Sequence, residues 1–336
     1  MSKLAEIVAK QFANRRVVII GDIVADQFLH GTISRVSREA PVFILDHDMT
    51  DTRAGGAANA AVNIASLGGD SVLIGFVGDD ENGTLLRESL TEGKVNCRFI
   101  ISDDRIRTTT KVRVLGGQQH APRQQVIRID YAQRTPVDHD LCEQLKENVI
   151  SACDGADAVV VSDYSYGAAE PGIMDAVREC SKENGTPVII DSRYRLQDFS
   201  GAVAATPNQE EVEQILGKNF TDESCELLRK RLGYKALLVT RGSKGMTLFE
   251  EGKPARQFEA VGSKEPIDVT GAGDTVIGAF ALGLASGLSF SDSAMIANHA
   301  GGIVVMKRGT AAVTTSELLA SLGSQAEDLT LATQSQ

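Results

Sequence analysis

This sequence of 336 residues lacks the features that mark secreted, membrane-spanning and zinc-binding proteins. Its five cysteines are scattered, and no two of them have C-x-x-C spacing, so we expect neither a disulfide framework nor a zinc site. No run of about 18 uninterrupted apolar residues occurs. The N-terminal segment is amphipathic and has neither the apolar run nor the cleavage site of a signal peptide. These absences predict a cytoplasmic protein that does not span a membrane.

Positive charge is also scarce. The chain has 34 Lys and Arg residues against 45 Asp and Glu, which gives a formal net charge of −11. A field of this sign repels nucleic acid and anionic membrane surfaces, so neither is expected as a partner. The same balance is also what solubility alone would favour. An anionic substrate would need a local cluster of Arg and Lys.

Two familiar nucleotide-binding motifs are absent. No G-x-x-x-x-G-K-S/T segment occurs, which excludes a P-loop kinase. The pair Gly271 and Gly273 lacks the third glycine of a dinucleotide fingerprint, lies late in the chain, and has no acidic partner on a following strand. The sequence therefore argues against an NAD-dependent oxidoreductase.

Short apolar runs alternate with helical patterns along the chain. This alternation predicts an α/β fold with a mostly parallel central sheet flanked by helices, because several of the runs are continuous, as in strands covered on both faces. The predicted strands are 17–21, 71–77, 158–162, 187–191, 202–206 and 236–240. The predicted helices are 57–67, 83–92, 141–152, 172–184, 210–216, 222–232, 275–286 and 291–307.

Two stretches, 27–48 and 97–131, break this alternation because their β-branched residues recur at nearly every second position. They predict antiparallel strands of a small second sheet outside the main one. Such a sheet can act as a lid over a cleft or as a dimerisation surface, and the two uses are compatible. We expect one domain over 1–322, with this lid, and a flexible tail over 323–336.

The most informative segment is 268–274, Asp-Val-Thr-Gly-Ala-Gly-Asp, which runs directly into an apolar helical pattern. Small residues at 271–273 let the backbone approach a ligand, and the N–H groups of a helix beginning there would face an anion. Asp274 would then lie beside a phosphoryl group, where its carboxylate could accept a proton from a hydroxyl. Taken alone, the segment also fits an aspartate helix cap in a glycine turn.

Two earlier segments place polar groups next to turns. Gly55 and Gly56 lead into a helix whose first turn carries Asn59, an arrangement that lets a polyhydroxylated ligand meet backbone and amide groups. The segment 21–26 follows the first predicted strand, where open α/β sheets bind ligands, and Asp26 could accept hydrogen bonds from sugar hydroxyls. Each segment alone also fits a turn or a helix face of small residues.

In this order and spacing, the three segments resemble the ribokinase-like (PfkB-type) carbohydrate kinases. The resemblance extends from Val17 to about Leu319 and includes both family signatures, the glycine–asparagine pattern over 55–78 and the block 268–281. It implies a Rossmann-like sheet with a small β lid. It also implies an enzyme that uses ATP and Mg²⁺ to phosphorylate a small-molecule sugar or sugar phosphate.

The resemblance also implies a role for each matching residue. Asp274 is the base, and the anion hole is formed by Gly271, Ala272 and Gly273. The sugar is held by Asp26, Gly55, Gly56 and Asn59. The nucleotide side comprises Asn208, Thr240, Arg241, Gly242, Gly245, Asn298 and Gly302. Glu211 organises Mg²⁺ through water, whereas Asp268 and Thr270 are candidates for binding a monovalent cation such as K⁺. Without the resemblance, 208–211 also fits a helix N-terminus with acidic residues in its first turn.

Residues 31–42 and 63–68 are similar to a narrower subgroup, the D-glycero-D-manno-heptose 7-phosphate kinases. This similarity implies phosphorylation of O1 to give the 1,7-bisphosphate, by a kinase with no nucleotidyltransferase domain after it. A substrate phosphate would need a cationic cluster, for which the lid offers Arg35, Arg38, Lys111, Arg113 and Arg128. Each of these can also be an ordinary exposed charge. The chain departs from the subgroup at Arg38, which replaces a proline, and at Tyr166 and Arg193, which replace lysines.

Other functions remain open at this point. The runner-up is another ribokinase-like kinase, acting on fructose 1-phosphate, a free pentose or hexose, or a nucleoside. A catalytically silent sugar-binding regulator on the same fold is a further alternative, which the intact glycine turn before Asp274 disfavours. We also expect a homodimer formed through the lid.

Overall fold

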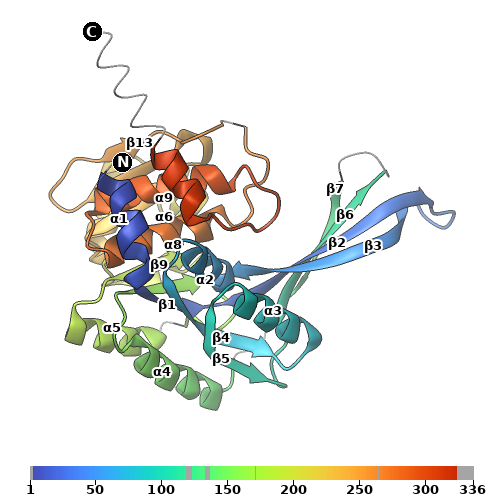
Figure 1. Cartoon of the computed structure of the whole chain (residues 1–336), viewed down its shortest axis with the longest axis horizontal. Helices are drawn as coiled ribbons and strands as arrows, with labels where there is room; N and C mark the ends of the chain where they lie inside the picture. The colour runs from blue at the N-terminus through green and yellow to red at the C-terminus, as the bar shows by residue number, and fades with distance from the viewer. Residues whose placement is uncertain (1–2, 119–122, 133–136, 171, 264, 324–336) are drawn as a thin grey trace, which may run out of the picture.

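The computed structural model describes residues 3–118, 123–132, 137–170, 172–263 and 265–323. Within these residues, nine strands form the main sheet and four form a second sheet that projects from the body (Figure 1). The predicted tail beyond 323 and part of the lid turn, 119–122, lie outside the described residues. In the described part, none of the helices has the length and hydropathy needed to cross a bilayer.

The predicted mostly parallel main sheet is confirmed. The order of its strands is β13-β12-β11-β10-β9-β8-β1-β4-β5, and all neighbours are parallel except at the β12 and β13 edge, which the sequence did not predict. The predicted strands appear as β1 (Arg16–Gly21), β4 (Asp70–Gly78), β8 (Ala158–Asp163), β9 (Val188–Ser192), β10 (Ala204–Ala205) and β11 (Ala236–Thr240). The antiparallel edge consists of β12 (Met246–Glu250) and β13 (Arg256–Phe258).

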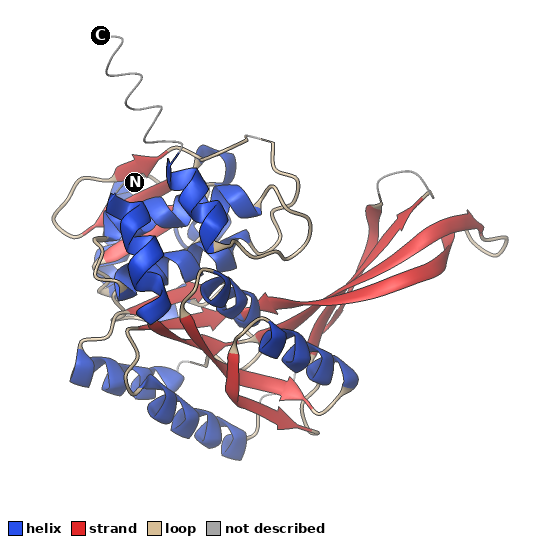
Figure 2. Ribbon diagram, viewed as in Figure 1, coloured by secondary structure: helices blue, strands red, loops and turns tan. Residues whose placement is uncertain are grey.

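Helices cover both faces of this sheet (Figure 2), which explains the continuous apolar runs of its central strands. In β1, Val17 and Ile19 belong to one buried cluster, and Val18 and Ile20 belong to the other. The first face carries α1 (Lys3–Gln11), α2 (Ala57–Ser66), α3 (Glu81–Glu92), α8 (Ala272–Ala285) and α9 (Phe290–Val304). The second face carries α4 (His139–Cys153), α5 (Ile173–Asn184), α6 (Gln209–Leu216) and α7 (Asp222–Leu232).

The main sheet reverses its winding at β1. The chain passes from β1 to β4 on one side and returns to β8 on the other, so β1 has parallel neighbours on both sides. Ligands in open α/β sheets bind at such a switch point, beyond the carboxyl ends of the strands. Asp22, Tyr164 and Arg193 follow β1, β8 and β9 there.

The second sheet has the order β3-β2-β6-β7 and corresponds to the predicted lid. It consists of β2 (Ile23–Val36), β3 (Phe43–Gly56), β6 (Thr109–Gly117) and β7 (Gln124–Tyr131). Its first two strands therefore extend beyond the predicted 27–48 at both ends. β2 begins only one residue after β1, so the lid grows directly out of the main sheet.

Two expectations about the lid are wrong. β5 (Asn96–Asp103) belongs to the main sheet, where it pairs with β4, because Phe99, Ile100 and Ile101 form a continuous buried run rather than an alternating one. The lid is also not wholly antiparallel, since β2 and β6 run parallel. Both strands leave the carboxyl edge of the main sheet, after β1 and β5, and therefore point outward in the same direction.

Gly245, which the sequence predicts to border the nucleotide, has to be glycine because of the way the strands pack around it. Its φ is 81°, and a Cβ atom there would lie 1.9 Å from the carbonyl oxygen of Phe258. Gly242 has a similar φ of 56°, but no atom lies within 4 Å of its added Cβ. Gly245 is therefore required by the approach of β12 to β13, whereas Gly242 faces open space.

We expect Gly245→Ala to lower the free energy of unfolding by about 3 kcal/mol or more, because backbone must move to relieve the clash. Gly242→Ala is the matched control and should cost only about 1 kcal/mol, since it adds left-handed strain without a clash. Urea denaturation of both variants measures the difference. Equal losses of stability would contradict the packing explanation.

Candidate active site

Asp274 lies in the first turn of α8, directly after a tight turn. Gly271 precedes the helix with a φ of 75°, a left-handed conformation that glycine adopts without strain. A Cβ atom at Gly271 would also lie 2.3 Å from the side-chain nitrogen of Asn59, so a larger residue does not fit here. The turn leaves Asp274 only 3% exposed at the N-terminus of the helix.

Two side chains from distant parts of the chain bind the Asp274 carboxylate. The Asn59 amide donates to Oδ2 at 2.8 Å, and the Tyr164 hydroxyl donates to Oδ1 at 2.7 Å. Burial raises the pKa of Asp274 to about 6, the charge of Asp26 adds to the rise, and the two hydrogen bonds and Arg193 oppose it. The carboxylate is therefore ionised at neutral pH and has a proton affinity suited to a general base.

The turn before α8 also presents backbone donors. The N–H of Ala272 donates to the carbonyl of Val269 at 3.2 Å. In the described part of the chain, the N–H groups of Gly273 and Asp274 have no protein acceptor. No atom lies within 4 Å of a Cβ added to Gly273, so this backbone faces open space. These donors and the helix dipole can bind a phosphoryl group.

The open space in front of the turn is a cleft of about 580 Å³. Its polar lining includes Tyr164, Asp191, Arg193, Asn208, Glu211, Arg241 and Asp274. The cleft continues into a second pocket of about 170 Å³, because the two share Thr240, Gly242, Val269, Ala272 and Gly273. The predicted base, anion hole and nucleotide loop therefore lie along one continuous hollow.

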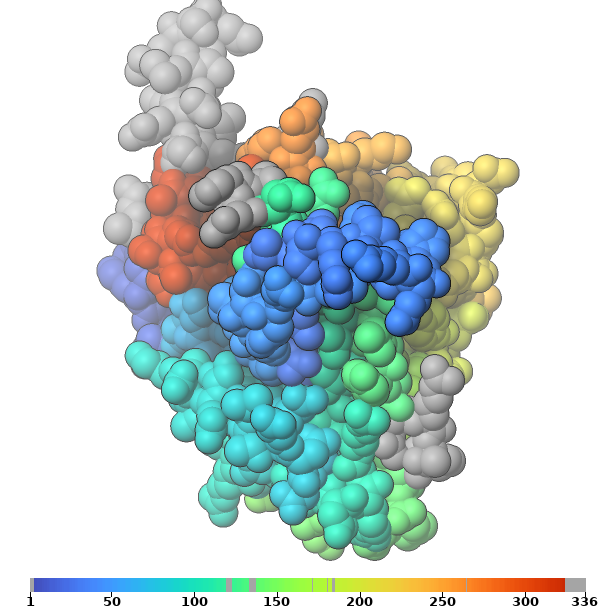
Figure 3. Space-filling view, turned by 90° about the vertical axis from the view of Figure 1, so that its right-hand side faces the viewer, coloured from blue at the N-terminus to red at the C-terminus, as the bar shows by residue number. Residues whose placement is uncertain are grey.

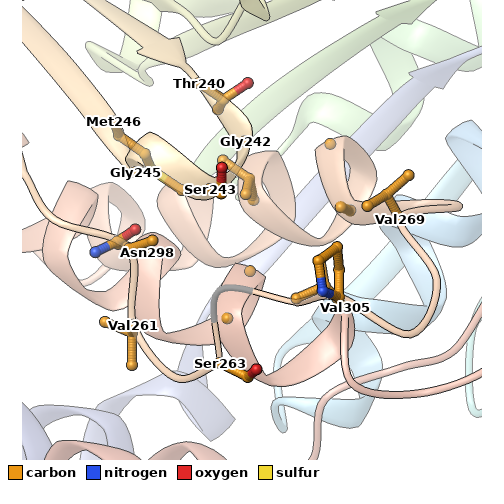
Figure 4. Close-up of a pocket in the computed structure, with 17 residues that line it drawn as sticks. Thr240, Gly242, Ser243, Gly245, Met246, Val261, Ser263, Val269, Asn298 and Val305 are labelled. Carbon is orange, nitrogen blue, oxygen red and sulfur yellow. The ribbon is translucent and has the colours of Figure 1, made fainter.

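The second pocket has mainly apolar walls that suit a flat ring (Figure 4). Thr240 and Met246 lie on one side of it, opposite Val305. Asn298 lines the pocket and donates from Nδ2 to the carbonyl of Glu259 at 2.7 Å. Gly302 permits a close approach of backbone, since its added Cβ would lie 2.3 Å from the carbonyl oxygen of Val261.

The base of the lid approaches Asp274 from another direction. Asp26 on β2 is 5% exposed and forms an ion pair with Arg113 of β6. A Cβ atom at Gly55 would lie 2.6 Å from the Asp26 carboxylate, and one at Gly56 would lie 2.6 Å from the carbonyl oxygen of Asp22. The paired glycines thus let β3 pass close to both aspartates.

Two cations lie on the ring of Tyr164. Lys111 Nζ, which comes from the lid strand β6, is 5.1 Å from the ring centre, and the Arg193 guanidinium carbon is 5.5 Å from it. Neither forms a salt bridge with any described residue. Burial lowers the pKa of Lys111 in spite of the nearby Asp26. Both cations therefore lie near Asp274 without a direct ion pair, although Asp26 acts on Lys111, and Asp191, Glu211 and Asp274 act on Arg193.

A sequence profile described as pfkB family carbohydrate kinase matches residues 14–317. The chain belongs to the PfkB carbohydrate kinase family. It is therefore an ATP-dependent phosphotransferase that acts on a sugar hydroxyl, as the sequence predicts.

The chain is similar to the bifunctional protein HldE of two bacteria. It is 38% identical over 330 residues to HldE of Aeromonas salmonicida, which covers 96% of this chain. It is 40% identical over 315 residues to HldE of Nitrosococcus oceani, which covers 91% of this chain. The chain spans just under two thirds of these relatives, 66% and 64% of their lengths.

Two solved structures share the ribokinase-like fold. The Arabidopsis thaliana ribokinase complexed with ribose and ATP has a TM-score of 0.69 and 22% identity, and the match covers 92% of this chain and 98% of that one. The Escherichia coli phosphofructokinase-2 in complex with substrates and products has a TM-score of 0.73 and 19% identity, over 90% and 97% of the chains. At this level of identity the likeness is one of fold.

PfkB kinases use ATP with a divalent metal, and two carboxylates of this kinase fit such an ion. Glu211 forms a capping box with Asn208, whose amide and backbone N–H donate to its two oxygens at 2.7 and 2.8 Å. Asp191 lies at the end of β9. Burial raises the pKa of both Asp191 and Glu211, and repulsion by the negative charge of Glu211 raises the pKa of Asp191 further. A cation held through water would offset this repulsion.

The same pair of acids cannot enclose a metal alone. In the described ranges, no three His, Cys, Asp or Glu side chains gather as a metal site. A divalent ion held here would therefore need further ligands, such as phosphate oxygens and water.

Asp268 and Thr270, the residues predicted to bind a monovalent cation, take part in hydrogen bonds that stabilise the turn before α8. Asp268 accepts a hydrogen bond from the Thr270 N–H at 2.9 Å and another from the Gly309 N–H at 2.8 Å. Both carboxylate oxygens are thus used to fix the approach to Gly271. Each oxygen keeps a further lone pair, which a monovalent cation bound here could use.

The predicted phosphate-binding cations of the lid separate into two groups. Lys111 and Arg113 lie at its base, near Asp26. Arg35 is exposed near the far end of β2, about 30 Å along the strand from Asp26, and Arg38 lies beyond that end. Arg128 forms an ion pair with Asp130 at 2.9 Å. Arg128 also lies opposite Arg113 in the pairing of β6 with β7, so within one chain only Arg35 and Arg38 are kept far from Asp274.

Sequence reasoning assigned no role to three groups of the site: the hydroxyl of Tyr164, the carboxylate of Asp191 and the guanidinium of Arg193, which it named only as a departure from the heptose kinase subgroup. It also assigned Asn59 to the sugar, whereas its amide binds Asp274 and the carbonyl of Gly271. The available signal was position, because all three missed residues follow or end a predicted strand at the carboxyl edge. The contacts themselves depend on packing between distant segments.

We expect Gly273→Ala to leave the fold intact and to weaken catalysis strongly, because the added methyl group meets no protein atom but enters the phosphoryl position. The rate constant kcat should fall about 100-fold, while the melting temperature stays within about 2 °C of the parent. Steady-state kinetics and a thermal scan measure the two quantities. Ser243→Ala, in the adjoining loop, serves as the control for a small change near the nucleotide. Parental kcat in Gly273→Ala would exclude this turn as the anion hole.

Proposed function

We propose that this kinase transfers the γ-phosphoryl group of ATP to O1 of D-glycero-D-manno-heptose 7-phosphate, giving the 1,7-bisphosphate and ADP. The observation that carries the proposal is the Asp274 carboxylate, buried beside unpaired N–H groups at the start of α8. The choice of sugar is supported by the motifs at 31–42 and 63–68 and by the similarity to HldE proteins.

In the proposed reaction, Asp274 accepts the proton of the sugar hydroxyl as its oxygen attacks the γ-phosphorus. The new O–P bond forms while the bond from the γ-phosphorus to the bridging oxygen breaks, and ADP leaves. Gly271, Ala272 and Gly273 surround the transferred group, whose charge is stabilised by free N–H groups and the helix dipole. The adenine ring occupies the apolar pocket.

The sugar is held by the base of the lid. Asp26 accepts hydrogen bonds from its hydroxyls, and Gly55 and Gly56 keep β3 close to it. Asn59 contributes to catalysis mainly by donating a hydrogen bond to Asp274, the proposed base. The phosphate of the sugar contacts Lys111, with Arg113 beside it, and the lack of a salt-bridge partner for Lys111 supports this assignment. A protein of net charge −11 needs such a local concentration of cations to attract a sugar phosphate.

Glu211 and Asp191 would hold, through water, the Mg²⁺ that accompanies ATP, and the ion would neutralise charge on the nucleotide phosphates. Asn208, Thr240, Arg241 and Gly242 border the nucleotide phosphates. The raised pKa values of the two acids support this position, because each acid prefers a nearby positive charge. A K⁺ ion at the turn of Asp268 and Thr270 is a further proposal. We also propose a cytoplasmic location, where ATP is available.

We further propose that two copies associate through their lids. The lid carries large apolar side chains that are 38–56% exposed. In Figure 3 the lid points toward the viewer, in front of the body. The exposed apolar side chains are Val36, Val42, Phe43, Met49, Val126, Ile127, Ile129 and Tyr131. Exposed apolar patches of this kind usually mark an interface. In such a dimer, Arg35, Arg38 and Arg128 would extend the cationic cluster.

An ADP-release assay with ATP, Mg²⁺ and a panel of free and phosphorylated sugars tests the reaction. We expect turnover with heptose 7-phosphate and a drop of at least about 1,000-fold in Asp274→Asn, which keeps the shape of the base but removes its proton affinity. The variant should still bind ATP, measured as a ligand-induced rise in melting temperature.

Each other outcome of these assays would refute a different part of the proposed function. Turnover on fructose 1-phosphate, a free sugar or a nucleoside would retain the base and refute the substrate. A rate in Asp274→Asn within about tenfold of the parent would refute the base. Sugar binding without any turnover would identify a silent regulator.

The lid dimer makes a separate prediction. Ile127→Glu should shift the protein from dimer to monomer, because it places a charge in the apolar patch. Ile150→Glu is the matched control, since Ile150 is similarly exposed (52%, against 54% for Ile127) but lies on α4. Sedimentation velocity over a range of concentrations measures the change. A parent protein that sediments as a monomer throughout would exclude the lid interface.

A further inference from the structure

Tyr164 contacts the proposed base, Asp274, but the reaction proposed above gives it no role. Its hydroxyl is 2.7 Å from Oδ1 of Asp274, while the Asn59 amide is 2.8 Å from Oδ2. Each carboxylate oxygen therefore has one protein donor and keeps a further lone pair for a substrate hydroxyl. The two donors fix the plane of the carboxylate from opposite edges.

The hydroxyl of Tyr164 acts as a donor in this contact. Burial and the charge of Asp274 raise the pKa of the phenol well above its usual value, so it stays protonated wherever the enzyme is active. An ionised carboxylate can only accept. The direction of the hydrogen bond is therefore set by the chemistry of both partners.

The backbone around Tyr164 is held unusually firmly for a loop. The buried carboxylate of Asp22 accepts the N–H groups of Tyr164 at 2.7 Å, Tyr166 at 3.0 Å and Ala168 at 2.9 Å. Ser165, between them, has a φ of 62°, which is strained for a residue other than glycine. Such strain persists only where the surroundings impose it, so the position of the Tyr164 ring is determined by the fold.

The ring of Tyr164 contacts groups from both ends of the site. Arg193, which lines the cleft with Asp191 and Glu211, lies over the ring. Lys111, which comes from the lid next to Asp26, also lies over it. The hydroxyl at the far end of the ring reaches the base.

We infer that Tyr164 is a positioning residue of the phosphoryl transfer: its hydroxyl aims the Asp274 carboxylate at the sugar hydroxyl and keeps it ionised. This inference rests on the proposed role of Asp274 as the base. Tyr164 stabilises the charged form of Asp274, which burial alone disfavours. Without its hydroxyl, the carboxylate holds its proton to a higher pH and loses one of its two restraints.

Other charges around Asp274 must be considered in any pH dependence. They are Asp26 on β2, Lys111 on β6, Asp191 and Arg193 at the end of β9, and Glu211 on α6. Tyr164→Phe changes none of them and keeps the aromatic ring that Lys111 and Arg193 contact. A shift in the pH profile of this variant therefore reports on the lost hydroxyl.

The test is the pH dependence of kcat/KM for the full chain, with ATP, Mg²⁺ and the sugar found in the panel assay. In the parent, activity should fall as pH decreases through about 6, because Asp274 becomes protonated. In Tyr164→Phe, we expect this acid limb to move up by about one pH unit and kcat at its plateau to fall about tenfold. Tyr166→Phe is the matched control, since its ring also lies near Lys111, at 5.6 Å, and its acid limb should not move.

A second variant covers the case in which Tyr164→Phe does not fold. Replacement of Tyr164 by 3,5-difluorotyrosine keeps the shape and makes the hydroxyl a stronger donor, so the acid limb should move down. If both variants show the parental acid limb while Asp274→Asn is inactive, the role of Tyr164 is refuted and the base assignment stands. If Asp274→Asn retains its activity, the proposed function itself has failed.

Discussion

The burial of one carboxylate at the start of α8 is the constraint on which this site depends. Removing an ionised Asp274 from water costs free energy unless polar groups replace the water. The fold provides them through Asn59 on α2 and Tyr164 after β8, two segments that meet only when the main sheet is complete. The same packing leaves the N–H groups of the helix N-terminus without acceptors. The proposed base and the proposed anion hole therefore both depend on this one arrangement.

A polar network behind Asn59 supports this arrangement. The Asn63 amide donates to the carbonyl of Asn59 at 3.0 Å, and its side-chain oxygen accepts from the Thr275 hydroxyl at 3.1 Å and from the Val313 N–H at 3.2 Å. α2, α8 and the segment after α9 are thus joined inside the apolar core. A fully satisfied buried network makes the relative position of such elements specific, because any displacement leaves polar groups unpaired. This specificity places the Asn59 amide within reach of Asp274.

Much of the architecture could be predicted from the sequence, and the part that could not has a common physical cause. Continuous apolar runs such as 17–21 predicted buried parallel strands, and small residues at 271–273 predicted the helix N-terminus beside Asp274, because both signals are local. The parallel pairing of β2 with β6, and the assignment of β5 to the main sheet, depend on which strands become neighbours. The roles of Tyr164, Asp191 and Arg193 likewise require contacts between distant segments, and the site assignments remain predictions.

Different parts of the chain border the apolar pocket and the base of the lid, and this separation affects how the specificity of the enzyme can change. Residues that border the apolar pocket come from 240 onward, whereas Asp26, Gly55 and Lys111 lie in the first third of the sequence. Under the proposed assignments, the acceptor and the adenine ring are thus bound mainly by separate stretches of the chain, which meet at the turn around Asp274. Under the same assignments, substitutions within 23–117 alter the acceptor side and leave the residues of the apolar pocket unchanged. The fold is in this sense modular.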